Sequence, residues 1–450
     1  MLLNVDVGRY LFVRPCYPKL LGFLDEARMS GTYQRFVIKG IPGIGKTTFL
    51  YYYLHVLIKQ KKCVVFEDFK GRMFLVLPDG KIFEGKRGDS VFKKPLADHS
   101  AYYLFNCGGS AGTATPLLDN VLAATFAASS PSIDHTQELC KTENHIVFTM
   151  PMWTLDELLS CRLKIHSPNS EAMVTESFRL RGGVARPAFY KGNPDYLQMQ
   201  LESALQKFAQ NPAAILSSIV GGADPQSISH QLMHYKVEDD FIRYSTIIAS
   251  DYIGDRMCDI NLKAVVERIA SLQTDKMGSA LRGGLFERFA HRVLALGSNA
   301  FGAGKTLLMS PVNGDRKRRI PIPNCIGTNV DLHVRQMCDL PICTTSNAGL
   351  YLIPEVPNFP VVDSLVLPRT GYQMTVSPTH DLEVGPLTEL LEKLKCTKRK
   401  KFRLVWVVPT DVEFKCRSIP DSISDRVEQY VLKLPLQVPL ALVKTPLNDL

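Results

Sequence analysis

A glycine-rich segment that ends in lysine and threonine is the strongest chemical signal in the sequence. Residues 40–47 read GIPGIGKT and match the pattern G-x-x-x-x-G-K-[ST] at every fixed position. In such a loop, backbone N–H groups surround phosphate oxygens, the lysine reaches the β- and γ-phosphates, and the Ser/Thr hydroxyl binds Mg²⁺. The pattern therefore predicts binding of ATP with Mg²⁺, with Thr47 as a metal ligand. The predicted nucleotide-binding residues of the loop are Gly40, Pro42, Gly43, Gly45, Lys46, Thr47 and Thr48.

An enzyme with this loop also needs an acidic residue for Mg²⁺ at the end of a neighbouring strand. The strand expected to supply it, at 101–106, ends in Asn106, and residues 107–109 (CGG) contain no glutamate. An amide oxygen coordinates Mg²⁺ but carries no charge. Glu67 and Asp68 end an earlier strand, which we expect at the edge of the sheet. We therefore expect nucleotide binding with slow or absent hydrolysis.

Two further polar residues are candidates for sensing the phosphates. Thr149 follows the apolar run HIVF, at the end of an expected strand, and Arg186 lies in the segment RGGVARPAF. A hydroxyl and a guanidinium are groups that distinguish a γ-phosphate from an empty site. The alternative for each is an ordinary surface or capping residue.

Separated acidic residues in the second half indicate phosphodiester hydrolysis. Glu287 lies in a helical pattern, Asp363 in the apolar run PVVDSLV, and Gln373 in the next run, GYQMTV. Oxygen ligands of this kind bind Mg²⁺, which polarises the phosphodiester and activates water. This is the pattern of the restriction-endonuclease-like core, so Glu287, Asp363 and Gln373 are predicted metal ligands. The predicted catalytic set is Glu287, Asp363, Gln373, Thr375, which replaces the usual lysine, and His380 as a substitute proton acceptor.

Two basic segments accompany this second constellation. They are Arg316–Arg319 (RKRR) and Lys398–Arg403 (KRKKFR). Clustered lysine and arginine contact the phosphate backbone of DNA with an affinity that falls as salt rises. We predict that DNA binds along these segments. A solvated loop and, for the second segment, a nuclear-import signal are the alternatives.

The order of apolar runs predicts an α/β protein with two domains. In the first half, strands alternate with helices, which favours a largely parallel sheet covered on both faces. Later come a helix at 280–296, three apolar runs near 349–377, a helix at 382–395 and the run RLVWVVP. We predict a P-loop NTPase domain at 1–222, a connecting segment at 223–254 that begins with a Gly/Pro break, and a restriction-endonuclease-like (PD-(D/E)xK-type) α/β domain at 255–450.

Composition narrows the class of protein. With 45% hydrophobic and 22% charged residues, the chain is globular rather than disordered or collagen-like. The net charge of +9 suits a polyanionic partner. Eleven cysteines without a CxxC pair favour a reducing compartment. No run of 18 apolar residues occurs, so we expect no membrane span. The composition does not decide whether the protein forms oligomers.

Six sequence blocks resemble a known family when they are taken in this order: GIPGIGKTTF, YYLFNCGG, IVFTMPMWTLDEL, LRGGVARPAF, GGLFERFAH and FPVVDSLVLPRTGYQMTVSPTH. The sequence from about Gly31 to Pro409 resembles the Crinkler effectors and the related retrotransposon hot spot proteins. The resemblance implies a P-loop NTPase of the broad AAA+/STAND type that regulates a DNA-acting, nuclease-like domain. It places Asn106 where a Walker B acid is expected and Arg186 where a sensor arginine is expected. It places Glu287, Asp363 and Gln373 on the nuclease motif.

These observations lead to one functional prediction and one alternative. We predict an intracellular, nuclear protein in which ATP binding regulates an attached Mg²⁺-dependent nuclease-like domain. Secretion into a host cell is implied by the family alone, because the N-terminal residues match neither its ubiquitin-like header nor its leader. The alternative is a nucleotide-switched binding module whose nuclease-like domain is catalytically degenerate, which Asn106 and Thr375 favour.

Overall fold

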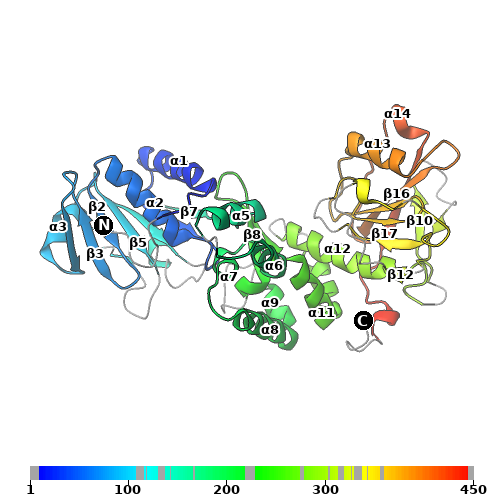
Figure 1. Cartoon of the computed structure of the whole chain (residues 1–450), viewed down its shortest axis with the longest axis horizontal. Helices are drawn as coiled ribbons and strands as arrows, with labels where there is room; N and C mark the ends of the chain where they lie inside the picture. The colour runs from blue at the N-terminus through cyan, green and yellow to red at the C-terminus, as the bar shows by residue number, and fades with distance from the viewer. Residues whose placement is uncertain are drawn as a thin grey trace. The chain divides into compact units, whose positions relative to one another are not determined.

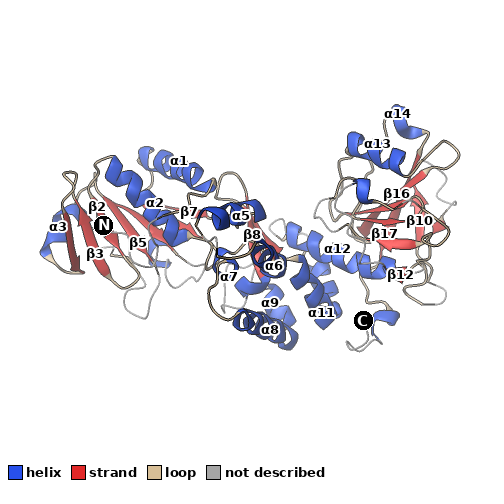
Figure 2. Cartoon of the chain, in the orientation of Figure 1, coloured by secondary structure: helices blue, strands red, loops and turns tan. Residues whose placement is uncertain are grey.

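The chain folds into two compact units, Met1–Ile253 and Gly254–Leu450 (Figure 1). Each unit has its own sheet with helices packed against it (Figure 2). No helix of the described residues combines the length and the apolar character that crossing a membrane requires. The computed structural model describes residues 10–107, 116–117, 119–129, 137–141, 143–165, 168–217, 229–273, 278–302, 305–312, 319–325, 327–328, 337–341, 343–354 and 359–443.

A seven-stranded sheet forms the centre of the first unit, with the strand order β4-β3-β2-β5-β6-β1-β7. Strands β2, β5, β6, β1 and β7 are parallel, and β3 and β4 extend the sheet beyond β2 as an antiparallel hairpin. The strand with Glu67 is therefore internal rather than at the edge. The strands are β1 (Arg35–Lys39), β2 (Val64–Glu67), β3 (Arg72–Val76), β4 (Ile82–Lys86), β5 (Tyr102–Asn106), β6 (Ala124–Ala128) and β7 (His145–Thr149).

Both faces of this sheet are buried, as parallel sheets require. Phe36 and Ile38 of β1 belong to the core on one face, with α1 (Cys16–Met29) and α2 (Lys46–Lys59). Val37 belongs to the core on the other face, which α3 (Ser90–Leu96) and α4 (Gln137–Cys140) cover. Because the central strands are parallel, the carboxyl ends of β1, β6 and β5 meet at one edge of the sheet.

Small helices follow the sheet and complete the first unit. Thr154 caps the first of them and forms a capping box with Glu157. The pattern predicts a connecting segment at 223–254, but residues 233–248 form an antiparallel hairpin whose turn residue Phe241 joins the core of the first unit. These elements are α5 (Leu155–Lys164), α6 (Glu171–Arg181), α7 (Ala185–Ala188), α8 (Pro194–Gln210), α9 (Pro212–Ser217), α10 (Ser229–Leu232), β8 (Met233–Val237) and β9 (Tyr244–Ile248).

The second unit contains an eight-stranded mixed sheet of order β11-β10-β17-β16-β15-β14-β13-β12. Its strands are β10 (Leu308–Pro311), β11 (Ile320–Pro321), β12 (Gly327–Thr328), β13 (Leu350–Leu352), β14 (Ser364–Val366), β15 (Thr370–Met374), β16 (Phe402–Pro409) and β17 (Val427–Leu434). Its helices are α11 (Asp251–Ser271), α12 (Ser279–Ala295), α13 (Val384–Lys393), α14 (Asp421–Ser424) and α15 (Leu440–Val443), with a 3₁₀ turn at Met337–Asp339.

The middle of this unit has the element order that the sequence predicts. Helix α12 is followed by the short strands β10, β11 and β12, which the sequence analysis does not predict. The antiparallel strands β13, β14 and β15, helix α13 and strand β16 then come in the predicted order, with β16 parallel to β15. Leu387, Leu390 and Leu391 of α13 are fully buried against Leu404 and Trp406 of β16. Strand β16 pairs with β15, near whose end the predicted site residue Gln373 lies.

Candidate functional site

The glycine-rich loop connects β1 to α2 at the carboxyl edge of the first sheet. Gly43 and Gly45 have φ values of +86° and +103°, a region that side-chain-bearing residues rarely adopt. A Cβ atom on Gly43 would lie 2.7 Å from Cβ of Arg186, and one on Gly45 would lie 2.7 Å from the Tyr17 hydroxyl. The loop therefore needs glycine at both positions, for conformation and for space.

Lys46, the first residue of α2, folds back over the loop. Its Nζ donates hydrogen bonds to the backbone oxygens of Gly40 (2.7 Å) and Ile41 (3.0 Å). Burial lowers the pKa of Lys46 to about 7, and the nearby Arg186 guanidinium adds to the effect. The amine thus occupies an uncompensated position, where phosphate oxygens are better partners than carbonyl oxygens.

Thr47 and Asn106 are brought together, although 59 residues separate them. The Thr47 hydroxyl donates to Oδ1 of the Asn106 side chain over 3.0 Å. Together they offer two neutral oxygens, which Mg²⁺ accepts when phosphates supply the charge. Glu67 does not compensate for the missing acid, because its carboxylate is fully buried and binds Arg87 (2.7 Å) and the Tyr103 hydroxyl.

Of the two predicted sensor residues, only Arg186 lies at the loop. Its backbone N–H donates to the Gly43 oxygen (3.2 Å), and it lines the same cavity as Lys46. Thr149 ends β7, on the other side of β1, is buried and is not among the residues that line this cavity. Ser129, which the sequence analysis did not single out, follows β6 between the ends of β1 and β5 and is fully buried.

A cavity of about 610 Å³ opens in front of the loop, within the usual range for small-molecule sites. Its polar end holds Lys46, Thr47 and Asn106, and Thr48 also lines it. Apart from Arg186, most of its other walls are apolar and come from both the N-terminal segment and the small helices. They include Leu11, Phe12, Trp153, Ile165, Ala185 and Phe189. The cavity thus combines the polar groups of the loop with apolar walls.

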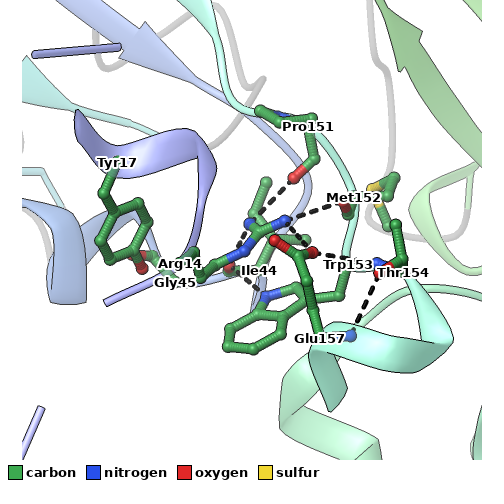
Figure 3. Close-up of polar contacts among 9 residues, drawn as sticks. All are labelled: Arg14, Tyr17, Ile44, Gly45, Pro151, Met152, Trp153, Thr154 and Glu157. Carbon is green, nitrogen blue, oxygen red and sulfur yellow. Dashed lines mark hydrogen bonds and ion pairs between the residues drawn. The ribbon is translucent and has the colours of Figure 1, made fainter. Parts of the chain in front are cut away.

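Arg14 connects the loop to neighbouring segments through the contacts that Figure 3 shows. Its guanidinium donates to the backbone oxygens of Pro151 (3.0 Å) and Met152 (2.8 Å), and more weakly to that of Ile44 (3.4 Å). It also forms an ion pair with Glu157 (2.9 Å), and its side chain is 1% exposed. One buried side chain therefore ties the N-terminal segment, the loop and the start of α5 together.

Two aromatic residues complete this support. The indole N–H of Trp153 donates to the Ile44 oxygen (2.7 Å), and the Tyr17 hydroxyl donates to the Gly45 oxygen (2.9 Å). The Arg14 guanidinium lies 4.4 Å from the centre of the Trp153 ring (Figure 3). These bonds fix the carbonyl groups of Ile44 and Gly45, and with them the conformation of the loop.

In the second unit, Asp363 precedes β14 and contacts the end of β15. Its Oδ2 accepts hydrogen bonds from Nε2 of Gln373 (3.0 Å) and from the backbone N–H of Met374 (2.5 Å). Burial, together with the charge of Glu287, raises the pKa of Asp363 to about 7, and these hydrogen bonds oppose the shift. The structure therefore brings Asp363, Gln373 and Glu287 into one neighbourhood, as predicted from sequence.

A histidine that the sequence analysis did not single out belongs to this neighbourhood. His291 lies one helical turn after Glu287 in α12, with its Nε2 3.9 Å from the Glu287 carboxylate. Its Nδ1 lies 2.8 Å from the hydroxyl of buried Tyr351. Burial raises the pKa of Glu287, but the hydrogen bond and charge of His291 bring it below the usual value. The sequence signal that could have identified this pair is the spacing of four residues between Glu287 and His291 in a predicted helix.

Thr375 and His380 have other partners. The Thr375 hydroxyl accepts the backbone N–H of Ser377 (3.0 Å). The His380 ring packs against Trp406 at 5.5 Å, and its Nδ1 lies 2.8 Å from the Asp381 oxygen. Within the described part of the chain, no hydrogen bond joins either side chain to Asp363.

The donor set fits a divalent cation only in part. The described residues contain no group of three His, Cys, Asp or Glu side chains arranged for a metal. Asp363 and Glu287 are close enough for repulsion to raise one pKa, which a cation between them relieves. Gln373, however, donates an amide N–H to Oδ2 of Asp363, so this carboxylate oxygen already has a partner.

The second basic segment lies away from Asp363. Residues 397–400 form a turn before β16, and Arg403 pairs with Thr370 at the start of β15. Asp363 contacts Met374 at the opposite end of β15. The segment Lys398–Arg403 is therefore separated from the acidic residues by the length of a strand. Arg319 is exposed, and Arg316 to Arg318 lie outside the described residues.

In the absence of metal, we expect the free energy of unfolding of the second unit to decrease as the pH is raised from about 4 to about 7. The pKa of Asp363 rises from 3.8 to about 7 on folding, so the folded protein holds the proton more tightly. The substitution D363N removes this dependence and raises the free energy of unfolding at about pH 8, by at most about 4 kcal/mol.

The measurement is urea unfolding followed by Trp406 fluorescence, with Trp153→Phe in both proteins so that only the second unit reports. The Glu287→Gln variant is the companion, because it removes the neighbouring charge and leaves Asp363 in place. A D363N protein with the same stability and the same pH profile as its parent contradicts the expectation.

Comparisons with known proteins place this sequence near two effectors. No protein-family model matches the chain. It is 25% identical over 406 residues to Crinkler effector protein 16 of Phytophthora infestans and 25% identical over 404 residues to Crinkler effector protein 15 of the same organism. Each alignment covers 86% of this chain and 62% of the relative. The chain thus spans less than two thirds of the length of these relatives.

One solved structure, a mutant of Thermotoga maritima RuvB, aligns with 62% of this chain and 87% of its own. Its sequence identity is 12% and its TM-score is 0.26. A score this low establishes no shared fold. The P-loop character of the first unit therefore rests on its own strand order and loop geometry.

Proposed function

We propose that this chain, which is similar to Crinkler effectors over most of its length, binds ATP with Mg²⁺ in its first unit. The observation that carries the proposal is the loop itself. Lys46 lies over it, and Thr47 contacts Asn106, in front of a cavity that is polar at one end and apolar at the other. The phosphates bind at the polar end, and the base occupies the slot near Phe12 and Phe189.

The same geometry supports binding without efficient turnover. Bound Mg²⁺ supplies charge neutralisation at the phosphates. In this chain, Thr47 and Asn106 orient that end of the nucleotide with neutral oxygens, and the Arg186 guanidinium approaches from α7. No carboxylate lines the cavity among the described residues, so none is placed to activate water.

The test is Asn106→Asp, which places a carboxylate 3.0 Å or so from the Thr47 hydroxyl. We expect Mg²⁺ to increase ATP affinity about tenfold more in this variant than in the parent, because a charged hydrogen-bonding partner is worth about 1.5 kcal/mol more than a neutral one. Calorimetric titration with ATP, with and without Mg²⁺, measures the difference. Asn144→Asp, in the same unit and away from the cavity, is the control. An unchanged Mg²⁺ dependence contradicts the role of Asn106.

We further propose that the second unit is a nuclease-like domain that acts on DNA and that ATP regulates it. Its support is the α-β-β-β-α-β order together with Asp363, Glu287 and Gln373 in one neighbourhood. The nucleus is the compartment we propose. The test is nicking of supercoiled plasmid with Mg²⁺, with and without ATP, beside D363N. Nicking that D363N abolishes supports this function, and a change with ATP supports regulation.

A second candidate function is a nucleotide-switched binding module with a degenerate nuclease-like unit. Two observations favour it. Thr375 stands where the nuclease motif has a lysine, and its hydroxyl accepts the backbone N–H of Ser377. Asp363 already accepts two hydrogen bonds from within the unit. The absence of nicking from folded, ATP-bound protein that still binds DNA selects this candidate.

A further inference from the structure

A second cavity lies beside the loop, within the first unit and separate from the cavity described above. It measures about 320 Å³ and is enclosed by the start of the loop, α7, α8, α10 and β8. It shares Pro42 and Arg186 with the nucleotide cavity. Its walls are largely apolar, and its size suits a small molecule.

His234 of β8 lines this cavity and is 2% exposed. One ring nitrogen bonds to the backbone of His230, and Nε2 has no hydrogen-bond partner among the described residues. Burial lowers the pKa of His234 to about 3, so the ring is neutral and Nε2 is a proton acceptor. A buried polar atom without a partner costs free energy that a bound donor recovers.

Gly182 leaves the room that the His234 ring occupies. Gly182 packs behind it, and a Cβ atom there would lie 3.1 Å from two atoms of the ring and 2.1 Å from the Ala249 oxygen. The glycine has a φ of +65°, which also disfavours any side chain. A glycine at position 182 is therefore needed to accommodate the ring beside this cavity.

The other lining residues define what a ligand must offer. Tyr190 and Tyr196 are stacked with ring centres 6.3 Å apart, beside Val184 and Leu201. Arg181 and Arg186 also line the cavity, and none of the described lining residues is acidic. Burial lowers the pKa of Arg181, so its charge is incompletely compensated. The cavity thus favours an aromatic body with a negative group and one donor.

We propose that this cavity binds a small aromatic acid whose hydroxyl or N–H donates to Nε2 of His234 and whose carboxylate contacts Arg181 or Arg186. The proposal does not depend on nucleotide binding. The ligand forms no covalent bond and needs no cofactor. Because Arg186 lines both cavities, the site is placed to communicate with the loop.

The test uses the full chain and three probes: 4-hydroxybenzoate, 4-methoxybenzoate and phenol. Ligand-observed NMR titration measures each affinity. We expect 4-hydroxybenzoate to bind with a Kd near 1 mM, in the range of about 0.4 kcal/mol per heavy atom for a ligand of about ten heavy atoms. We expect the methyl ether, which cannot donate, and phenol, which lacks the charge, to bind at least about tenfold more weakly.

The variant His234→Leu keeps the cavity apolar and removes the acceptor, and we expect it to lose this preference for the hydroxyl. His55→Leu, on an exposed position of α2, is the matched control. Equal affinity of wild-type protein for the hydroxy and methoxy acids overturns the proposal without any variant. Failure of 4-hydroxybenzoate to bind, or binding that His234→Leu leaves unchanged in folded protein, also overturns it.

Discussion

Replacing Lys46 with alanine is expected to weaken ATP binding at least about 100-fold. Each hydrogen bond between a charged amine and a phosphate contributes about 1.5–3 kcal/mol, and 1.4 kcal/mol corresponds to a factor of ten. Lys46 already lies over the loop, bonded to the Gly40 and Ile41 oxygens, so it needs only to exchange these partners for phosphate. Fluorescence titration with an ATP analogue measures the change.

The matched control for this substitution is Lys59→Ala. Lys59 is the last residue of the same helix and is exposed, so its substitution also removes a lysine side chain from α2 without reaching the loop. We expect its ATP affinity to stay within about threefold of the parent. Thermal unfolding of both variants excludes a loss of binding through misfolding. If Lys46→Ala binds ATP as well as Lys59→Ala does, the loop is not a nucleotide site.

Replacing Arg14 with alanine is expected to destabilise the first unit by about 3–5 kcal/mol, the usual cost of removing one partner of a buried ion pair. Three carbonyl groups and Glu157 lose their donor, and the side chain is only 1% exposed. Arg14→Lys keeps the charge but cannot reach all four acceptors, because an ammonium lacks the planar donor fork. We expect it to recover less than half of the loss.

The two tryptophans allow this measurement to be specific for one unit. Trp153 lies in the first unit and Trp406 in the second, so a Trp406→Phe background leaves Trp153 as the sole tryptophan reporter. Urea unfolding of Arg14→Ala in that background gives the loss of stability. Lys19→Ala, at an exposed position of α1, is the control and should change stability by less than about 0.5 kcal/mol. A similar small effect for Arg14→Ala contradicts its supporting role.

The parts of the fold that sequence predicts well are those with local signals. The phosphate-binding loop is a contiguous pattern, and the Thr154 cap is fixed by Glu157 three residues later. The order of helix and strands around Asp363 follows from apolar runs and their spacing. Each of these depends on neighbours in the chain rather than on tertiary contacts.

Strand β6 shows why other parts could not be predicted. Its residues 124–128 read ATFAA, and small side chains give a weak strand signal although all five are buried. When β6 is not recognised, Thr149 is the polar residue at a strand end that the pattern places nearest to the loop. In the structure, β6 is inserted between β1 and β5, and Ser129 takes that place. Arg14 and His234 were equally hidden, because their roles arise from contacts with distant segments.

The position of Lys46 also has a consequence for the acid–base balance of binding. In the empty loop its pKa is about 7, so at about pH 8 most molecules carry an uncharged amine. Phosphate oxygens restore the usual preference for the ammonium form. Nucleotide binding then removes nearly one hydrogen ion from the medium for every site filled. The heat of binding consequently varies with the ionisation enthalpy of the buffer, and nucleotide affinity increases as the solution is acidified toward neutrality.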